Sequence, residues 1–167
     1  AISFETASAG SLGERVRIIN DGLTFNGDTA AANALDDYEE VSFNPIVAQG
    51  IDGGATHVIQ RGWAVKIGAF VHFSLFLRFS GTGNGNHFKI GGLPFTSANT
   101  PYSAAYNSGG FVPFTNAHFN NSNPQQVFIG ANTTNMEFYN GNNSNTTISG
   151  AGSNKDIYVV GEYRTAT

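Results

Sequence analysis

The sequence contains no cysteine, and only 12% of its 167 residues are charged. The absence of cysteine excludes disulfides and thiolate metal sites, and the charged share is about half of that in an average globular protein. No apolar run approaches the roughly 18 residues of a membrane span, and we identify no secretory signal. Because the chain begins at Ala1 rather than at a methionine, we expect a fragment or processed product of something longer.

Acidic residues are missing from the middle of the chain. Residues 1–52 contain nine acidic and two basic residues, whereas residues 53–136 contain four basic residues and no acidic one. These four bases are Arg61, Lys66, Arg78 and Lys89. They are spread out, whereas a nucleic-acid-binding surface needs a dense basic patch. The sequence therefore predicts no nucleic-acid partner and, without an apolar span, no membrane insertion.

Glycine, asparagine and aromatic residues are abundant instead. The chain has 21 glycines and 19 asparagines, and 13% of its residues are aromatic. Glycine and asparagine tolerate the positive φ angles that tight turns require. Few charges and many aromatic side chains are the opposite of a disordered composition. This composition predicts a packed domain of many short strands joined by turns.

The clearest strand covers residues 71–79, where apolar side chains fall on alternate positions. The face predicted to be core consists of Val71, Phe73, Leu75, Leu77 and Phe79. The opposite face is mixed, as at a subunit contact, and consists of His72, Ser74, Phe76 and Arg78. Residues 81–86 are predicted to form a loop.

Further short strands are predicted along the rest of the body at 41–43, 87–90, 111–114, 126–131, 136–139, 146–148 and 156–163. Pro45 places the first of these near a sheet edge. No segment with helical periodicity competes within residues 55–167. The sequence therefore predicts an all-β fold, an antiparallel β-sandwich with a jelly-roll-like arrangement, over residues 41–167.

Residues 1–40 differ from the body and predict an N-terminal neck. The segment Glu14–Ile19 alternates polar and apolar residues, Asn20-Asp21-Gly22 is a turn signal, and Leu23–Phe25 is the return strand of a β-hairpin. The alanine-rich stretch 29–40 is compatible with one or two helical turns. A lone hairpin is marginal in water, so we expect three copies to wrap around an axis as an intertwined trimer. The alternative is a flexible linker.

Several motifs resemble the distal, C-terminal regions of bacteriophage tail-fibre proteins of the marine and cyanobacterial type. Glu14–Gly22 is similar to their "ERMRI…G" hairpin, and Leu35–Glu40 followed by Phe43–Pro45 is similar to "LDDYEEGTFTPT". Matches to the sheet module of these proteins lie at 65–68, 71–79, 81–83, 90–97 and 158–163. The order holds over roughly the whole chain. Val41-Ser42 and Trp63-Ala64 depart from the usual Gly-Thr and Arg-Tyr, and residues 98–154 match no motif.

This resemblance implies a trimeric fibre tip, exposed on the virion, that contacts a receptor on the host-cell surface, usually a glycan. It implies that the rest of the fibre joins at the N-terminal end. The family carries no known catalytic residues or cofactor to transfer, so we expect a non-enzymatic protein. Two alternatives stay open: a purely structural trimerisation or decoration module, and a polysaccharide depolymerase.

The acidic cluster is the main candidate for catalysis. It consists of Asp36, Asp37, Glu39 and Glu40. Two of these could act as general acid and base on a glycoside. Consecutive carboxylates beside a junction are more typical of a solvated turn or of salt-bridge partners for the neighbouring chain, and Arg15, Arg17 and Lys66 are suitable partners. We therefore favour the structural interpretation.

The four histidines, His57, His72, His87 and His118, are isolated from one another in the sequence. A trimer could bring three copies of one histidine to an axial metal. Histidines satisfied by hydrogen bonds within strands are the preferred interpretation, so we predict no metal site.

Candidate receptor-binding residues lie in the region from Thr100 to Asn145. Aromatic rings stack on the CH faces of sugars, and amides exchange hydrogen bonds with sugar hydroxyls. Asparagine also fills turns for purely structural reasons, which is the alternative at each position. The candidates are Tyr102, Tyr106, His118, Asn120, Asn121, Asn123, Asn142 and Asn143.

Overall fold

The computed structural model describes most of the chain, namely residues 1–8, 11–20, 22–29, 38–99, 106–120, 124, 126–140 and 145–165. For residues 8 and 106–108 only the backbone is described. Every regular element among the described residues is a β-strand, so the predicted all-β class is confirmed. The predicted helical turns in 29–40 fall largely outside the described residues, because 30–37 lie there. The described part contains no helix that could span a membrane.

The chain divides into two compact units. One contains residues 1–39 together with 66–68, and the other contains residues 40–65 and 69–167. The first unit is built on a three-stranded antiparallel sheet of β1 (Ile2–Ser8), β2 (Ser11–Ile19) and β3 (Gly22–Phe25), in that order. The predicted hairpin is therefore confirmed as β2 and β3, whereas β1 is a strand that the sequence pattern did not indicate.

Apolar residues line up across this N-terminal sheet. Ile2 pairs with Ile18, which pairs with Leu23 on its other side. Phe4 pairs in the same way with Val16, which pairs with Phe25. Since directly opposed residues share a face and alternate residues return to it, the six side chains form one apolar face, which we call the N-terminal apolar face.

The second unit contains one nine-stranded sheet, in the order β4-β6-β7-β12-β9-β10-β11-β8-β5. The strands are β4 (Tyr38–Phe43), β5 (Ile46–Gln49), β6 (Thr56–Ile67), β7 (Phe70–Ser80), β8 (Lys89–Gly91), β9 (Tyr106–Thr115), β10 (Gln126–Gly130), β11 (Met136–Tyr139) and β12 (Lys155–Arg164). The strand β12 lies at the centre, antiparallel to both β7 and β9.

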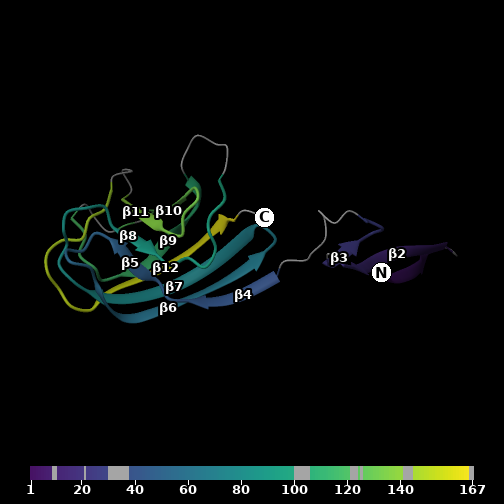
Figure 1. Cartoon of the computed structure of the whole chain (residues 1–167), viewed down its shortest axis with the longest axis horizontal. Helices are drawn as coiled ribbons and strands as arrows, with labels where there is room; N and C mark the ends of the chain where they lie inside the picture. The colour runs from purple at the N-terminus through teal and green to yellow at the C-terminus, as the bar shows by residue number, and fades with distance from the viewer. Residues whose placement is uncertain are drawn as a thin grey trace. The chain divides into compact units, whose positions relative to one another are not determined.

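The sheet curls so that its two edges meet. Its outermost strands, β4 and β5, are separated in the chain only by Asn44 and Pro45. So short a link spans at most about 10 Å, which forces the ends of the sheet together. Figure 1 shows β6 and β7 on one side of the curl and β8, β10 and β11 on the other. The prediction that Pro45 marks a sheet edge is therefore confirmed.

The core fills the inside of this curl. The predicted alternation in β7 is confirmed, because Val71, Phe73, Leu75, Leu77 and Phe79 are all buried. Phe88 connects the two sides of the curl: its ring stacks on Phe79 of β7 at 5.6 Å and lies 5.1 Å from that of Phe138 of β11. Such aromatic pairs stabilise a core beyond the area they bury.

Tyr163 of β12 closes the core at one end. Its ring meets Phe73 edge-on at 6.0 Å, and its hydroxyl donates a hydrogen bond to the carbonyl oxygen of Phe95 at 2.9 Å. Burial raises the pKa of Tyr163 to about 12. The hydroxyl therefore remains a donor at physiological pH, and the loop containing Phe95 is held against the sheet.

One strand prediction for the body is wrong, and two strands of the body were missed. Residues 146–148 do not form a strand; isolated bridges lie there, at Asn145 and Ile148. Strand β6 was missed because its inward positions carry Gly62, Ala64 and Lys66, which do not read as an apolar face. The ring of Phe43 takes the place of a side chain at Gly62, where a Cβ would lie 2.5 Å from it. The short edge strand β5 was also missed.

Candidate functional site

The predicted receptor-binding residues are only partly within the described structure. His118 and Asn120 are described and exposed on the segment that follows β9. Tyr106 begins β9, and its side chain is not described. The other predicted residues, Tyr102, Asn121, Asn123, Asn142 and Asn143, lie outside the described residues. The structure therefore places two of the predicted side chains, and both lie on one short segment.

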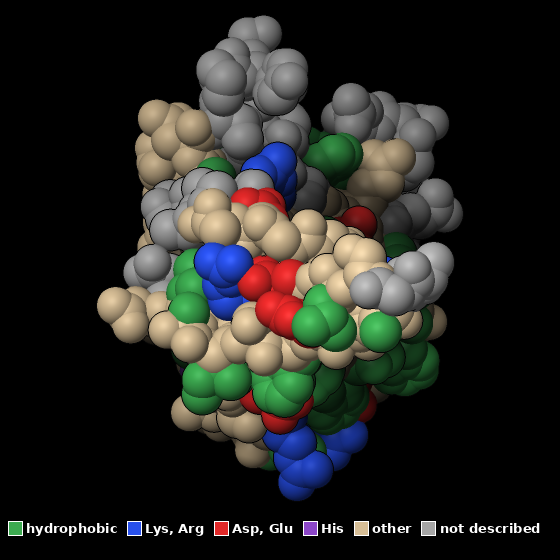
Figure 2. Space-filling view, turned by 90° about the vertical axis from the view of Figure 1, so that its right-hand side faces the viewer, with side chains coloured by type: hydrophobic (Ala, Val, Ile, Leu, Met, Phe, Trp, Pro, Cys, Tyr) green, Lys and Arg blue, Asp and Glu red, His purple; other side chains and the backbone are tan. Residues whose placement is uncertain are grey.

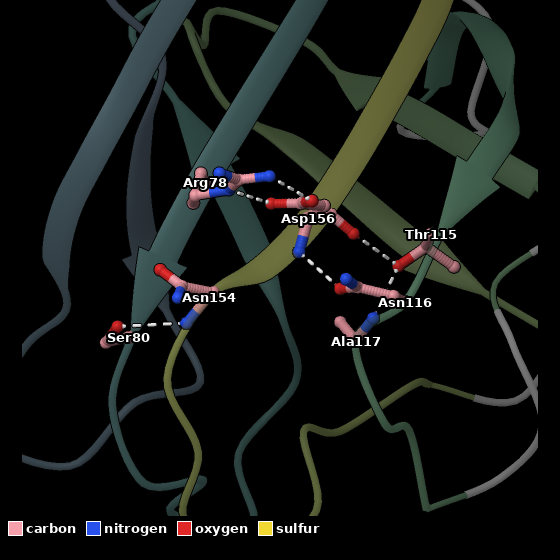
Figure 3. A network of polar contacts seen from close by, with 7 residues as sticks. All are labelled: Arg78, Ser80, Thr115, Asn116, Ala117, Asn154 and Asp156. Atoms are coloured by element: carbon pink, nitrogen blue, oxygen red, sulfur yellow. Dashed lines mark hydrogen bonds and ion pairs between the residues drawn. The ribbon is translucent and has the colours of Figure 1, made fainter.

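The start of this segment is anchored to the first residues of β12 (Figure 3). The Asn116 side chain accepts a hydrogen bond at Oδ1 from the backbone N–H of Asp156 at 2.6 Å, and the Asn116 N–H donates to the Asp156 carbonyl at 3.1 Å. The Thr115 hydroxyl donates to that same carbonyl at 2.8 Å. These bonds fix the Asn116 side chain in one orientation.

The end of the segment is anchored to residues 147–149. The N–H of Asn120 donates to the Thr147 carbonyl, and its side-chain amide donates to the Thr147 hydroxyl, both at 2.9 Å. The His118 carbonyl accepts from the Ser149 N–H at 2.8 Å. The Asn120 amide therefore has an internal structural role, whereas the imidazole of His118 is exposed.

A surface hollow of about 390 Å³ lies beside this segment, where β9 ends and β12 begins. We call it the β12 hollow. None of the described side chains that line it is a carboxylate. Its lining residues are Asn116, His118, Ala151, Gly152, Ser153, Asn154 and Lys155.

Lys155 is the one cationic side chain among the described residues that line the β12 hollow, and it is only 4% exposed. Its ammonium donates hydrogen bonds to the carbonyl oxygens of Gly81 at 2.8 Å and Gly152 at 2.9 Å. Burial lowers the pKa of Lys155, because desolvation disfavours the charged form. Lys155 pairs with no carboxylate among the described residues, so its charge is only partly compensated by carbonyl dipoles.

The acidic side chain nearest in sequence is already neutralised. Asp156 accepts two hydrogen bonds from the Arg78 guanidinium, at 2.6 and 2.8 Å (Figure 3). This bidentate bond lowers the pKa of Asp156. Asp156 and Arg78 are also directly opposed between β12 and β7. The pair locks the register of the two central strands.

The Arg78–Asp156 pair predicts a specific pH dependence of stability. A carboxyl whose pKa is lower in the folded state contributes stability above its unfolded pKa of about 3.9 and loses it as pH falls through the folded value. We therefore expect Asp156→Asn to be less stable than the parent chain at pH 7, and the difference to shrink as pH falls below the unfolded value and through the lower folded one. Urea unfolding between pH 7 and 2.5 measures this difference, with Glu162→Gln, on the same face of β12, as the matched control. A difference that stays constant with pH would contradict the role of the pair.

A second surface lies on the outward face of the central strands. Phe111 and Phe114 of β9 are more than half exposed, and they oppose Val160 and Tyr158 of β12. Tyr158 in turn opposes Phe76 of β7. These five side chains form an apolar patch on one side of the sheet, which we call the outward patch. Figure 2 looks from a different side, that of β2 and β3 in Figure 1, where hydrophobic side chains also lie at the surface beside charged ones.

A smaller hollow of about 240 Å³ lies beside the outward patch. Gly110 and Gly161 line it, and Phe111, His72 and Glu162 are also part of its wall. Gly110 is required there because a Cβ would lie 2.4 Å from the Val160 carbonyl oxygen. The result is a depression in an otherwise apolar face, of a size that suits a protruding side chain.

The predicted acidic cluster is only partly described, because Asp36 and Asp37 lie outside the described residues. Within one chain the Lys66 ammonium lies 3.1 Å from Glu39, whereas pairing between neighbouring chains stays a prediction. The Arg17 guanidinium pairs with Glu14 in the same strand at 2.6 Å. Arg15 instead donates to the Thr6 hydroxyl at 2.9 Å.

Two of the histidines are satisfied by the backbone, as predicted. The Nε2 atom of His57 accepts from the Val47 N–H at 2.9 Å, and that of His87 lies 2.7 Å from the Phe138 carbonyl oxygen. Among the described residues, no three histidine or acidic side chains gather in a way that could hold a metal ion.

The β12 hollow itself was missed by the sequence reasoning. Residues 151–154 look like an ordinary turn, and Lys155 looks like a strand-end lysine. One signal was present: Lys155 shares its alternation with Ile157 and Val159, which are core residues. A lysine at an inward position is unusual and marks a place worth examining.

The arrangement offers two kinds of binding surface: apolar sheet faces suited to protein contacts and a polar hollow suited to a small polar ligand. The comparisons add no relative to this picture: no protein-family model, no curated protein and no solved structure matches the chain.

Proposed function

We propose that this chain is the tip of a phage tail fibre, which assembles as a trimer and attaches to a glycan on the host-cell surface. Residues 1–40 would form the neck that joins the rest of the fibre, and residues 41–167 would form a jelly-roll-like head. The curled antiparallel sheet is compatible with such a head.

The observation that supports this proposal most strongly is the N-terminal apolar face. Ile2 is 61% exposed, Phe4 57% and Phe25 48%, although all three lie on one sheet face. Isolated surface hydrophobics are ordinary, but a contiguous apolar face on a thin sheet marks an interaction surface. Three copies that pack these faces against one another around an axis would bury them all.

The outward patch supports assembly independently. It places exposed aromatic side chains of β9 and β12 beside a depression lined by Gly110 and Gly161. A neighbouring copy that inserts a side chain there would bury both features. This fits the mixed outward face of β7, which was interpreted as a subunit contact. Subunit contact through two surfaces is typical of an intertwined assembly.

If attachment occurs through surface loops, substitutions in these loops should weaken receptor binding without affecting trimer assembly. Loops can vary freely and therefore carry recognition, whereas strands are fixed by packing. We expect Tyr102→Ala, Asn121→Ala and Asn142→Ala, combined in one chain, to leave the trimer and its melting temperature nearly unchanged. Binding to host cells should fall sharply, because avidity multiplies the loss in each subunit.

Cell attachment and a glycan array measure binding, and the mass of the complex measures assembly. Attachment that survives the triple substitution would move the site away from these loops. A stable trimer that binds neither cells nor glycans would favour a purely structural module. Release of products from host polysaccharide would favour a depolymerase.

A further inference from the structure

The β12 hollow has an excess of hydrogen-bond donors. A lysine ammonium has three N–H groups, and Lys155 gives two of them to the carbonyls of Gly81 and Gly152. The third has no partner among the described residues. Because the side chain is almost completely buried, that N–H lacks the free access to bulk water that a surface lysine has.

Asn116 presents a donor for a clear geometric reason. Its Oδ1 atom is occupied by the backbone N–H of Asp156 at 2.6 Å. An amide has its acceptor on one side and its donor NH₂ on the other, so the NH₂ group is what remains for a ligand. It has no partner in the described part of the chain. His118, exposed on the same lining, adds an imidazole that can also donate.

The charge at the hollow is positive and incompletely compensated. Of the lining residues that the structure describes, Lys155 is the one with a charged side chain. The carboxylate of Asp156 is taken up by Arg78 in a bidentate bond. A buried ammonium without an anionic partner is unfavourable, and the lowered pKa of Lys155 reflects that cost. A negatively charged ligand group would relieve it.

We propose that the β12 hollow binds the carboxylate of an acidic sugar, such as a uronic acid, in the host-surface glycan. The carboxylate accepts from the Lys155 ammonium and the Asn116 NH₂ group. Sugar hydroxyls exchange hydrogen bonds with Ser153, Asn154 and His118. A volume of about 390 Å³ lies in the lower part of the range for small-ligand sites, roughly 300–1,000 Å³. It therefore suits a short stretch or branch of a glycan. This inference rests on the proposed function and specifies its ligand.

The test compares matched acidic and neutral oligosaccharides on the intact chain. An array presents uronic-acid and sialic-acid oligosaccharides beside neutral counterparts of the same linkage, and titration calorimetry measures the pairs that bind. We expect at least tenfold tighter binding of an acidic oligosaccharide than of its neutral counterpart, equivalent to about 1.4 kcal/mol.

Two substitutions test the named donors. Asn116→Asp keeps the oxygen that accepts from the Asp156 N–H but replaces the donor with a negative charge. Lys155→Met removes the ammonium and keeps the apolar stem. Each should weaken acidic-sugar binding at least tenfold. Arg164→Met is the matched control, because it removes a cation from the other end of β12, about 30 Å away, and should change affinity less than twofold.

The outcomes separate this inference from the proposed function. Melting temperatures show that each variant is folded, and Asn116→Asp serves alone if Lys155→Met does not fold. Equal affinity for acidic and neutral sugars, or unchanged binding by Asn116→Asp, overturns the acidic-sugar site while glycan attachment stands. Binding to no glycan and no host cell contradicts both.

Discussion

The double substitution Phe4→Asp and Ile18→Asp should convert a trimer into single chains. Both residues belong to the N-terminal apolar face, on neighbouring strands. Packing this face against other copies would bury the new carboxylates without partners, and each buried unpaired charge is strongly unfavourable. Sedimentation should therefore report the 17.7 kDa of one chain instead of three times that mass. The near-ultraviolet spectrum of the body should change little.

A matched control carries the same two added charges away from that face. Ser3 is exposed and alternates with Ile2 and Phe4 along β1, and Asn20 is exposed in the turn after β2. We expect Ser3→Asp with Asn20→Asp to remain trimeric. Dissociation of the control to the same extent would show that added charge alone disrupts assembly. Persistence of the Phe4→Asp and Ile18→Asp trimer would show that copies do not meet through this face.

Core substitutions in β7 should have the largest effect on the stability of the body. Phe73 is fully buried and touches Tyr163, and Leu75 is 1% exposed. Phe73→Ala should lower the free energy of unfolding by about 3–5 kcal/mol, and Leu75→Ala by about 2–5 kcal/mol, from lost burial and the cavity left behind. His72→Ala, on the outward face, should cost no more than about 0.5 kcal/mol.

Urea unfolding at one fixed protein concentration measures these differences, because the stability of an assembly depends on concentration. Because both residues lie in β7, the comparison contrasts the buried face of one strand with its outward face. Equal losses for Phe73→Ala and His72→Ala would mean that both faces of β7 are equally important to stability, contrary to their burial.

The fold was predictable where alternation was strong. The β7 face from Val71 to Phe79 and the hairpin of β2 and β3 follow directly from residue periodicity. The strand β6 was not predictable in the same way. Its inward positions hold Gly62 and Lys66, which depend on contacts distant in sequence: the ring of Phe43 over Gly62 and the carboxylate of Glu39 beside Lys66. Such contacts cannot be inferred from the residue pattern of the strand itself.

The candidate site was less predictable than the fold. His118 was selected for its residue type, whereas Asn116 and Lys155 acquire their roles from partners elsewhere in the chain. Asn116 is oriented by Asp156, forty residues away, and Lys155 by Gly81, seventy-four residues away. The pairing of β12 with its two neighbours, β7 and β9, brings these residues together. From the sequence alone, only one signal of this site could be inferred, namely that Lys155 alternates with the buried residues Ile157 and Val159.

The mass of the unmodified chain in solution is the most direct test of the proposed trimer. Light scattering after size exclusion at micromolar concentration requires no host, receptor or variant. We expect a particle of three chains, because a copy alone would leave Ile2, Phe4 and Phe25 exposed to water. A single species of 17.7 kDa across the micromolar range would contradict it.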